Sequence, residues 1–136
     1  MTMTPGLLGQ GEFPGELSSV PKARRYVRDL LDAAGHAQAD DALLLVSELV
    51  ANAVRHSDSG RRPGGQVHVA VANCDGTLHI DVIDAGSPEH RPSLRADTCI
   101  GSCTGRGLWL VDEIASAWGW HDTPAGRVVW FQLTGQ

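Results

Sequence analysis

The centre of the chain contains, at residues 43–56, the stretch LLLVSELVANAVRH. Its apolar residues, among them Leu45 and Leu49, recur at steps of three and four, which predicts one buried helical face. The aspartates at residues 40–41 favour a helix N-terminus just before it, because acidic side chains complement the positive end of the helix dipole. Residues 57–65 are polar and contain glycine and proline, so we expect the helix to end before them.

The chain before this helix predicts another helix and a weak strand. Ser18 and Pro21 are typical of a helix start. One helical face then follows, formed by Ala23, Tyr26, Val27, Leu30 and Leu31. Residues 7–13 could form a short edge strand, but glycines interrupt it. We therefore treat residues 1–12 as a flexible N-terminal segment.

After residue 65 the apolar period changes from helical to two. Residues 67–71 and 78–82 each alternate between apolar and other side chains, and turn residues at 73–76 separate them. This pattern predicts a β-hairpin. Residues 84–106 contain glycines and prolines without a sustained period. A loop of that length in a small domain is usually functional or disordered.

The end of the chain completes an α+β pattern. Helical spacing returns over residues 108–115, and short strands are expected at 117–121 and 127–133. The expected order is a weak strand, two helices, a hairpin, a long loop, a helix and two strands. Because helices and strands are partly segregated, we expect the helices to cover one face of a single sheet.

Composition restricts the class of protein. A length of 136 residues favours one domain. Eleven basic residues against sixteen acidic ones give a net charge of −5, which argues against a general nucleic-acid binder. No apolar run is long enough to span a bilayer, and the N-terminus has no signal-peptide pattern. Together with three cysteines, which fit reduced thiols, this predicts a cytoplasmic protein without a membrane partner.

Glu48 and Asn52 interrupt the apolar run of the central helix. They are four residues apart, so they project from the same side of the helix. One interpretation is a site where an amide oxygen meets a hard cation and a carboxylate handles a proton. The alternative is an ordinary amphipathic helix that exposes both side chains to solvent.

Two further short motifs have the same ambiguity. Asp84-Ala-Gly86 follows a predicted strand, where an acid could accept a hydrogen bond from a ligand's amino group; the alternative is a simple turn. Gly105-Arg106-Gly107-Leu108 opens the last helix, where backbone N–H groups could face an anion; the alternative is a flexible turn. The second motif is neither a Walker A loop nor a dinucleotide-binding fingerprint.

In this order and spacing, the motifs resemble the GHKL (Bergerat-fold) ATPase and kinase superfamily. Residues 48–56 are similar to its N box, residues 84–86 to its G1 box and residues 105–108 to its G2 box. Residues 87–104 would then be the ATP lid, and residues 126–130 resemble the last box. The most similar group is the stand-alone histidine-kinase-like ATPases of actinobacteria, related to anti-sigma-factor serine kinases of the RsbW/SpoIIAB type.

The resemblance implies a fold and a set of residue roles. The fold would be a two-layer α/β sandwich with a mixed sheet, and residues 13–136 would form one ATP-binding domain. Asn52 would coordinate Mg²⁺, and Glu48 would be the catalytic base. Asp84 would accept a hydrogen bond from the adenine amino group, with Gly86 leaving room for the base.

The same resemblance assigns the phosphates to the last motif. Gly105 and Gly107 would turn their backbone N–H groups toward the phosphates, within the motif that Leu108 closes. Arg106 and His56 would be neighbours of the lid and the phosphates.

The resemblance also implies a function. The chain would be an ATP-dependent serine/threonine protein kinase and anti-sigma factor that binds a sigma factor and phosphorylates a STAS-domain antagonist (an anti-anti-sigma protein). The alternative is a nucleotide-binding signalling module without kinase turnover. Relatives are often dimers, so a homodimer is compatible with either function.

Overall fold

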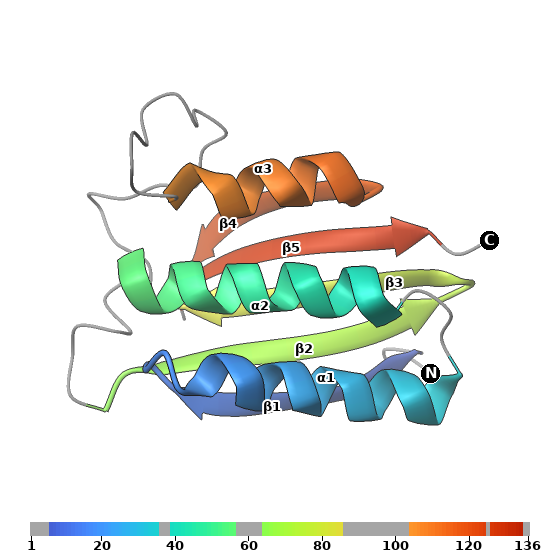
Figure 1. The fold of residues 1–136 in the computed structure, drawn as a ribbon, viewed down its shortest axis with the longest axis horizontal. Coiled ribbons are helices and arrows are strands. Elements are labelled where there is room, and N and C mark those ends of the chain that lie inside the picture. Colours follow the sequence, from blue (N-terminus) through green and yellow to red (C-terminus); the bar gives the residue numbers. More distant parts are fainter. Residues whose placement is uncertain (1–5, 36–38, 57–63, 86–103, 125, 135–136) are drawn as a thin grey trace.

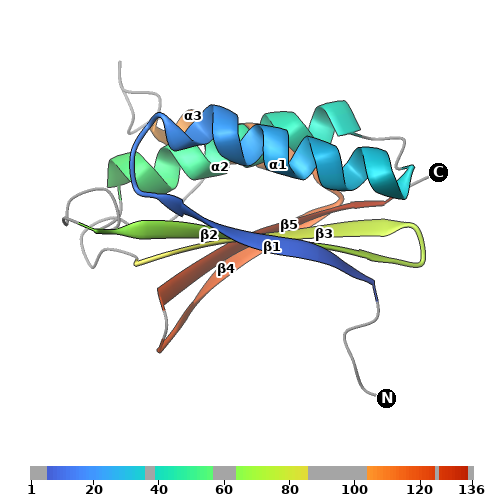
Figure 2. The same ribbon diagram turned by 90° about the horizontal axis from the view of Figure 1, so that it is seen from below.

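The computed structural model describes residues 6–35, 39–56, 64–85, 104–124 and 126–134, with the backbone alone described for residues 39, 56 and 104–108. Its helices are α1 (Ser19–Ala34), α2 (Ala39–His56) and α3 (Thr104–Ile114). Its strands are β1 (Leu7–Pro14), β2 (Gln66–Cys74), β3 (Thr77–Asp84), β4 (Ala117–Thr123) and β5 (Gly126–Thr134). The three helices lie side by side on one face of the sheet, with α2 between α1 and α3 (Figures 1 and 2). The expected α+β class and the covered sheet face are confirmed.

The strand order in the sheet is β1-β2-β3-β5-β4, and all four neighbouring pairs are antiparallel. The expectation of a mixed sheet is therefore wrong for the described strands. The chain does make a crossover from β3 through α3 to β4, and these two strands run in the same direction. However, β5 lies between them, so the crossover produces no parallel neighbours.

The hairpin of β2 and β3 follows the sequence closely. Cys74 pairs with Thr77, and Asp75 and Gly76 form a two-residue turn with φ angles of 53° and 83°. Positive φ at both turn positions matches the twist of the flanking strands and explains the Asp-Gly pair. The alternation then places Val71 and its neighbours of the same parity on the helix side.

The N-terminal strand corrects the expected flexible segment. Residues 7–12 belong to β1, which pairs with β2, so only the strand alternative for this stretch is right. The glycines that interrupt the apolar pattern lie under α1. A Cβ atom on Gly9 would meet the Tyr26 hydroxyl at 2.8 Å, and one on Gly11 would contact the same ring. Glycine therefore lets the helix pack closely on the edge strand.

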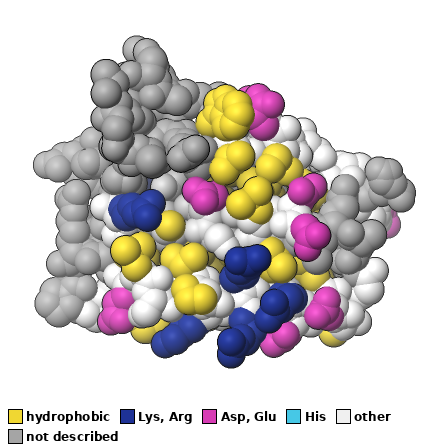
Figure 3. Space-filling model, in the orientation of Figure 1, with side chains coloured by type: hydrophobic (Ala, Val, Ile, Leu, Met, Phe, Trp, Pro, Cys, Tyr) yellow, Lys and Arg dark blue, Asp and Glu magenta, His cyan; other side chains and the backbone are white. Residues whose placement is uncertain are grey.

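Both long helices begin where the sequence predicts. The Ser18 hydroxyl donates to Glu16 and does not cap α1, whereas the Ser19 hydroxyl donates to the carbonyl of Pro14 at 2.6 Å and ties the helix to the end of β1. Helix α2 carries Asp40 and Asp41 in its first turn, as expected. The exposed side of α1 carries many basic residues, and Figure 3 shows Lys and Arg gathered over this helix.

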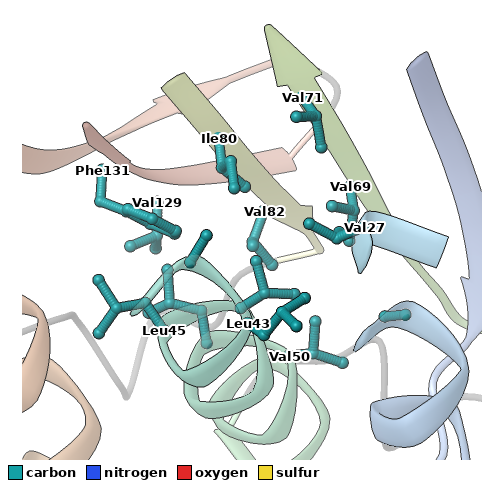
Figure 4. Close-up of a cluster of buried hydrophobic side chains, with 14 of the residues drawn as sticks. Val27, Leu43, Leu45, Val50, Val69, Val71, Ile80, Val82, Val129 and Phe131 are labelled. Carbon is teal, nitrogen blue, oxygen red and sulfur yellow. The ribbon is translucent and has the colours of Figure 1, made fainter. Parts of the chain in front are cut away.

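The hydrophobic core fills the space between the two layers. Leu45 lies on the side of α2 toward Phe131 of β5, whereas Leu43 and Val50 lie on the side toward Val27 of α1 (Figure 4). All five side chains are buried. The apolar faces of the helices and of the strands both point into this layer, so their packing fixes the rotation of α2 over β3.

The helix-free face of the sheet carries a polar and aromatic cluster. The ring of His79 stacks on Trp130 with 5.5 Å between centroids. Its Nε2 lies 2.9 Å from Asp81 and its Nδ1 lies 3.1 Å from the amide nitrogen of Gln132. Both ring nitrogens have partners within the sheet, so this histidine has a structural role. Among the described helices, none is both long and apolar enough to cross a membrane.

Candidate functional site

Helix α2 presents Glu48 and Asn52 on its side toward α3. Both side chains are half-buried, and they alternate along the helix with the buried Leu45 and Leu49. Leu45 marks the side of α2 that faces β5 and α3 (Figure 4). Residues three and four apart share a helical face, so the carboxylate and the amide lie along that same side. Both side chains therefore remain partly accessible, to a ligand or to solvent.

The end of α2 brings a further predicted residue to this region. His56 is the last residue of the helix, and its side chain lies outside the described residues. Arg55, just before it, is exposed. The C-terminal end of α2 lies at the same end of the molecule as the N-terminal end of α3 (Figure 1).

Asp84 is the last residue of β3 and is only 8% exposed. Strand β3 ends at the same end of the molecule as α2, and the two elements are in contact (Figure 1). A buried carboxylate requires hydrogen-bond or charge partners. Its burial argues against a simple solvent-exposed turn at this position. Gly86, two residues further on, lies outside the described residues.

The last motif lies inside a helix. Helix α3 starts at Thr104, so residues 105–108 occupy its first turns and do not precede it. The sequence suggests a later start because glycine has a low helix propensity. The described backbone still places the start of α3 at the α2–β3 end of the fold (Figure 1). The first N–H groups of a helix lack intrahelical acceptors and attract anions.

The described residues therefore bring three of the predicted motifs to one end of the fold. They are the polar side of α2, the end of β3 and the start of α3. The side chains of Arg106 and Leu108 and nearly all of the proposed lid at residues 87–104 lie outside the described residues. Their assigned roles stay predictions.

Arg127, at the start of β5, lies within residues 126–130, which resemble the last box, but the sequence predicts no role for it. It is 6% exposed and is the register partner of Asp84. Its Nε donates to Asp122 Oδ1 at 2.8 Å, and its guanidinium carbon lies 4.9 Å from the centroid of the Trp120 ring. In the sequence, the only sign of a special role is that an arginine begins an otherwise apolar strand. Its position opposite Asp84 follows from the strand register alone.

Backbone packing at this point depends on a glycine. Gly126 has a φ of 145°, and a Cβ atom there would lie 2.1 Å from the carbonyl oxygen of Asp84. No side chain fits without moving one of the two strands. The close approach fixes the position of Asp84 relative to the head of β5.

The donor groups fit a magnesium ion that is held largely by a nucleotide. Mg²⁺ prefers oxygen ligands and retains several waters, so one amide oxygen, as on Asn52, together with phosphate oxygens is a suitable set. The described residues contain no group of three or more His, Cys, Asp or Glu side chains that could hold a metal ion. Cys99 and Cys103 lie outside them.

Comparison with protein families identifies the class. Residues 13–133 match the model of the histidine kinase-like ATPase domain, so the chain belongs to this family. The match covers all three helices and strands β2, β3 and β4 completely, together with the end of β1 and all but the last residue of β5. A search of curated proteins gives no match. Family membership supports an ATP-binding regulatory function.

Proposed function

We propose that this chain is an ATP-dependent serine/threonine protein kinase and anti-sigma factor. Its substrate would be a STAS-domain antagonist, and its target a sigma factor. The observation that carries the proposal is the placement of Glu48 beside Asn52 on α2, at the end of the fold that also holds Asp84 and the start of α3. The family match supports nucleotide binding at these elements.

Each element has a distinct task in this proposal. Asn52 would hold Mg²⁺, and the first N–H groups of α3 would bind the phosphates. Asp84 would accept a hydrogen bond from the adenine amino group. Bound Mg·ATP supplies the phosphoryl group and neutralises charge at the phosphates. Glu48 would accept the proton of the attacking serine hydroxyl, since a carboxylate within reach of that hydroxyl can act as a general base.

Replacing Glu48 distinguishes phosphate transfer from nucleotide binding. We expect Glu48→Ala to bind Mg·ATP within about twofold of the unaltered chain while losing at least about 100-fold in phosphate transfer, the usual contribution of a general base. Transfer of labelled γ-phosphate to STAS proteins encoded in the same genome measures this. Glu113→Ala is the matched control, because Glu113 is an exposed carboxylate near the opposite end of α3.

Two outcomes would reject the kinase. Unaltered protein that binds ATP but labels no STAS protein would favour the alternative, a nucleotide-binding signalling module that presents a surface to its partner without turnover. Transfer that survives in Glu48→Ala would remove Glu48 from the role of base. A protein that fails to bind Mg·ATP at all would contradict both functions.

A further inference from the structure

Arg127 is a buried cation next to the carboxylate that we assign to adenine. The register of β3 and β5 places it directly opposite Asp84, and both side chains are almost completely buried. Opposite residues in antiparallel strands share a face of the sheet, with Cβ atoms about 5 Å apart. The two side chains therefore start from neighbouring positions on the helix side of the sheet.

Two contacts hold Arg127 in this position. Its Nε donates to Asp122 Oδ1 at 2.8 Å, and the guanidinium lies over Trp120. The Asp122 side chain is 57% exposed, whereas that of Arg127 is 7% exposed. Ion pairs with an exposed member are weakened by solvent screening, so Asp122 compensates the buried charge only in part. The buried carboxylate of Asp84, the register partner of Arg127, places further negative charge on the same face of the sheet.

The same proximity acts on Asp84. Burial favours the neutral form of a carboxyl group, and a neighbouring cation favours the ionised form. The two forms recognise different ligands, because an ionised carboxylate only accepts hydrogen bonds and a protonated one also donates. The 6-amino group of adenine is a donor, so it requires an acceptor.

We propose that Arg127 is a positioning residue whose charge, held in place by Asp122 and Trp120, keeps Asp84 in the acceptor form that selects a 6-amino purine. This inference rests on the proposed nucleotide site. It adds a residue that acts through Asp84 and does not touch the base itself.

The other charged groups around β3 occupy different positions. Helix α2, on the same face, carries Asp40, Asp41, Glu48 and Arg55. On the helix-free face, β2, β3 and β4 carry His68, His79, Asp81 and His121. Arg127 alone is the register partner of Asp84. Among the described side chains, removing its charge therefore takes away the cation opposite Asp84 in the strand pair.

The test measures base discrimination at two pH values. Calorimetric titration in the presence of Mg²⁺ measures the affinity of the chain for ATP and for purine riboside 5′-triphosphate, which lacks the 6-amino group. The ratio of the two affinities cancels proton uptake by the phosphates. We expect the unaltered chain to prefer ATP equally at about pH 8 and about pH 6, because Asp84 stays ionised at both.

In Arg127→Gln we expect the preference for ATP to persist at about pH 8. At about pH 6 the preference should be smaller than at about pH 8, since a neutral neighbour raises the pKa of the Asp84 carboxyl and favours its protonated form. Arg25→Gln, the same change on the exposed face of α1, should behave like the unaltered chain.

A preference in Arg127→Gln that does not change with pH, whether retained or lost, would overturn the role of Arg127 while leaving the nucleotide site intact. If Arg127→Gln does not fold, as judged by circular dichroism, Arg127→Lys decides the matter. This variant keeps the charge and should show no loss at low pH; a loss there would overturn the proposal. An unaltered chain that does not discriminate between the nucleotides would reject the adenine role of Asp84 itself.

Discussion

At the scale of single residues, the candidate site consists of polar groups that the fold buries only in part or at a cost. Asp84 ends a strand whose preceding inward side chains are Leu78, Ile80 and Val82, and it is itself buried. A carboxylate at the end of such a series is expensive to bury unless it binds something. In the proposed function, this carboxylate is the group that recognises the adenine amino group.

Asp84→Asn tests this assignment directly. An amide keeps one acceptor oxygen but loses the negative charge and turns a donor toward the base, so the hydrogen bond from adenine should be weaker. We expect Mg·ATP to raise the melting midpoint of the unaltered chain by mass action and to raise that of Asp84→Asn by clearly less. Asp81→Asn is the control, since Asp81 lies on the opposite face of the same strand. An equal shift in both variants would rule out the adenine contact.

The sequence predicts some site residues and not others, for a physical reason. Glu48, Asn52 and Asp84 belong to short motifs whose order along the chain is informative. Arg127 acquires its neighbours through strand register and the close approach at Gly126, which depend on residues far apart in sequence. Cross-strand pairing of this kind has no local signature.

At the scale of elements, the sequence predicts best where one period is strong. The alternating residues of β2 and β3 and the Asp-Gly turn specify the hairpin, and the apolar face of α2 specifies its rotation. The prediction of β1 is weaker because its glycines have a low strand propensity. They are present because they allow close packing against α1. The prediction of a mixed sheet was wrong because the order of the elements along the chain does not reveal that β5 lies between β3 and β4.

The packing of α1 on β1 is testable by a double-mutant cycle. A Cβ atom on Gly9 would lie 2.8 Å from the Tyr26 hydroxyl and 3.1 Å from the Leu30 side chain, so Gly9→Ala should destabilise the fold by about 1–3 kcal/mol through overpacking. Tyr26→Phe removes the hydroxyl and should relieve part of this clash. We expect a coupling of at least about 0.5 kcal/mol in urea unfolding. Strictly additive effects would show that the helix moves away freely.

At the scale of the whole molecule, the core and the site occupy different regions. Buried side chains from the three helices and from β2, β3 and β5 fill the layer between the helices and the sheet, whereas the site elements meet at one end. Ile80 pairs with Val71 and Phe131 in the middle of the sheet. It lies four residues before Asp84, or about 13 Å along the strand.

This separation predicts that stability and binding respond to different substitutions. Ile80→Val should lower the free energy of unfolding by about 1 kcal/mol, because it removes one buried methylene group, and should leave Mg·ATP affinity within about twofold. Asn52→Ala should change the stability of the nucleotide-free chain by less, because Asn52 is only half-buried, and should weaken Mg·ATP binding. Urea unfolding without nucleotide and calorimetric titration with it measure the two quantities. Equal losses of affinity in both variants would mean that the core transmits its strain to the nucleotide site.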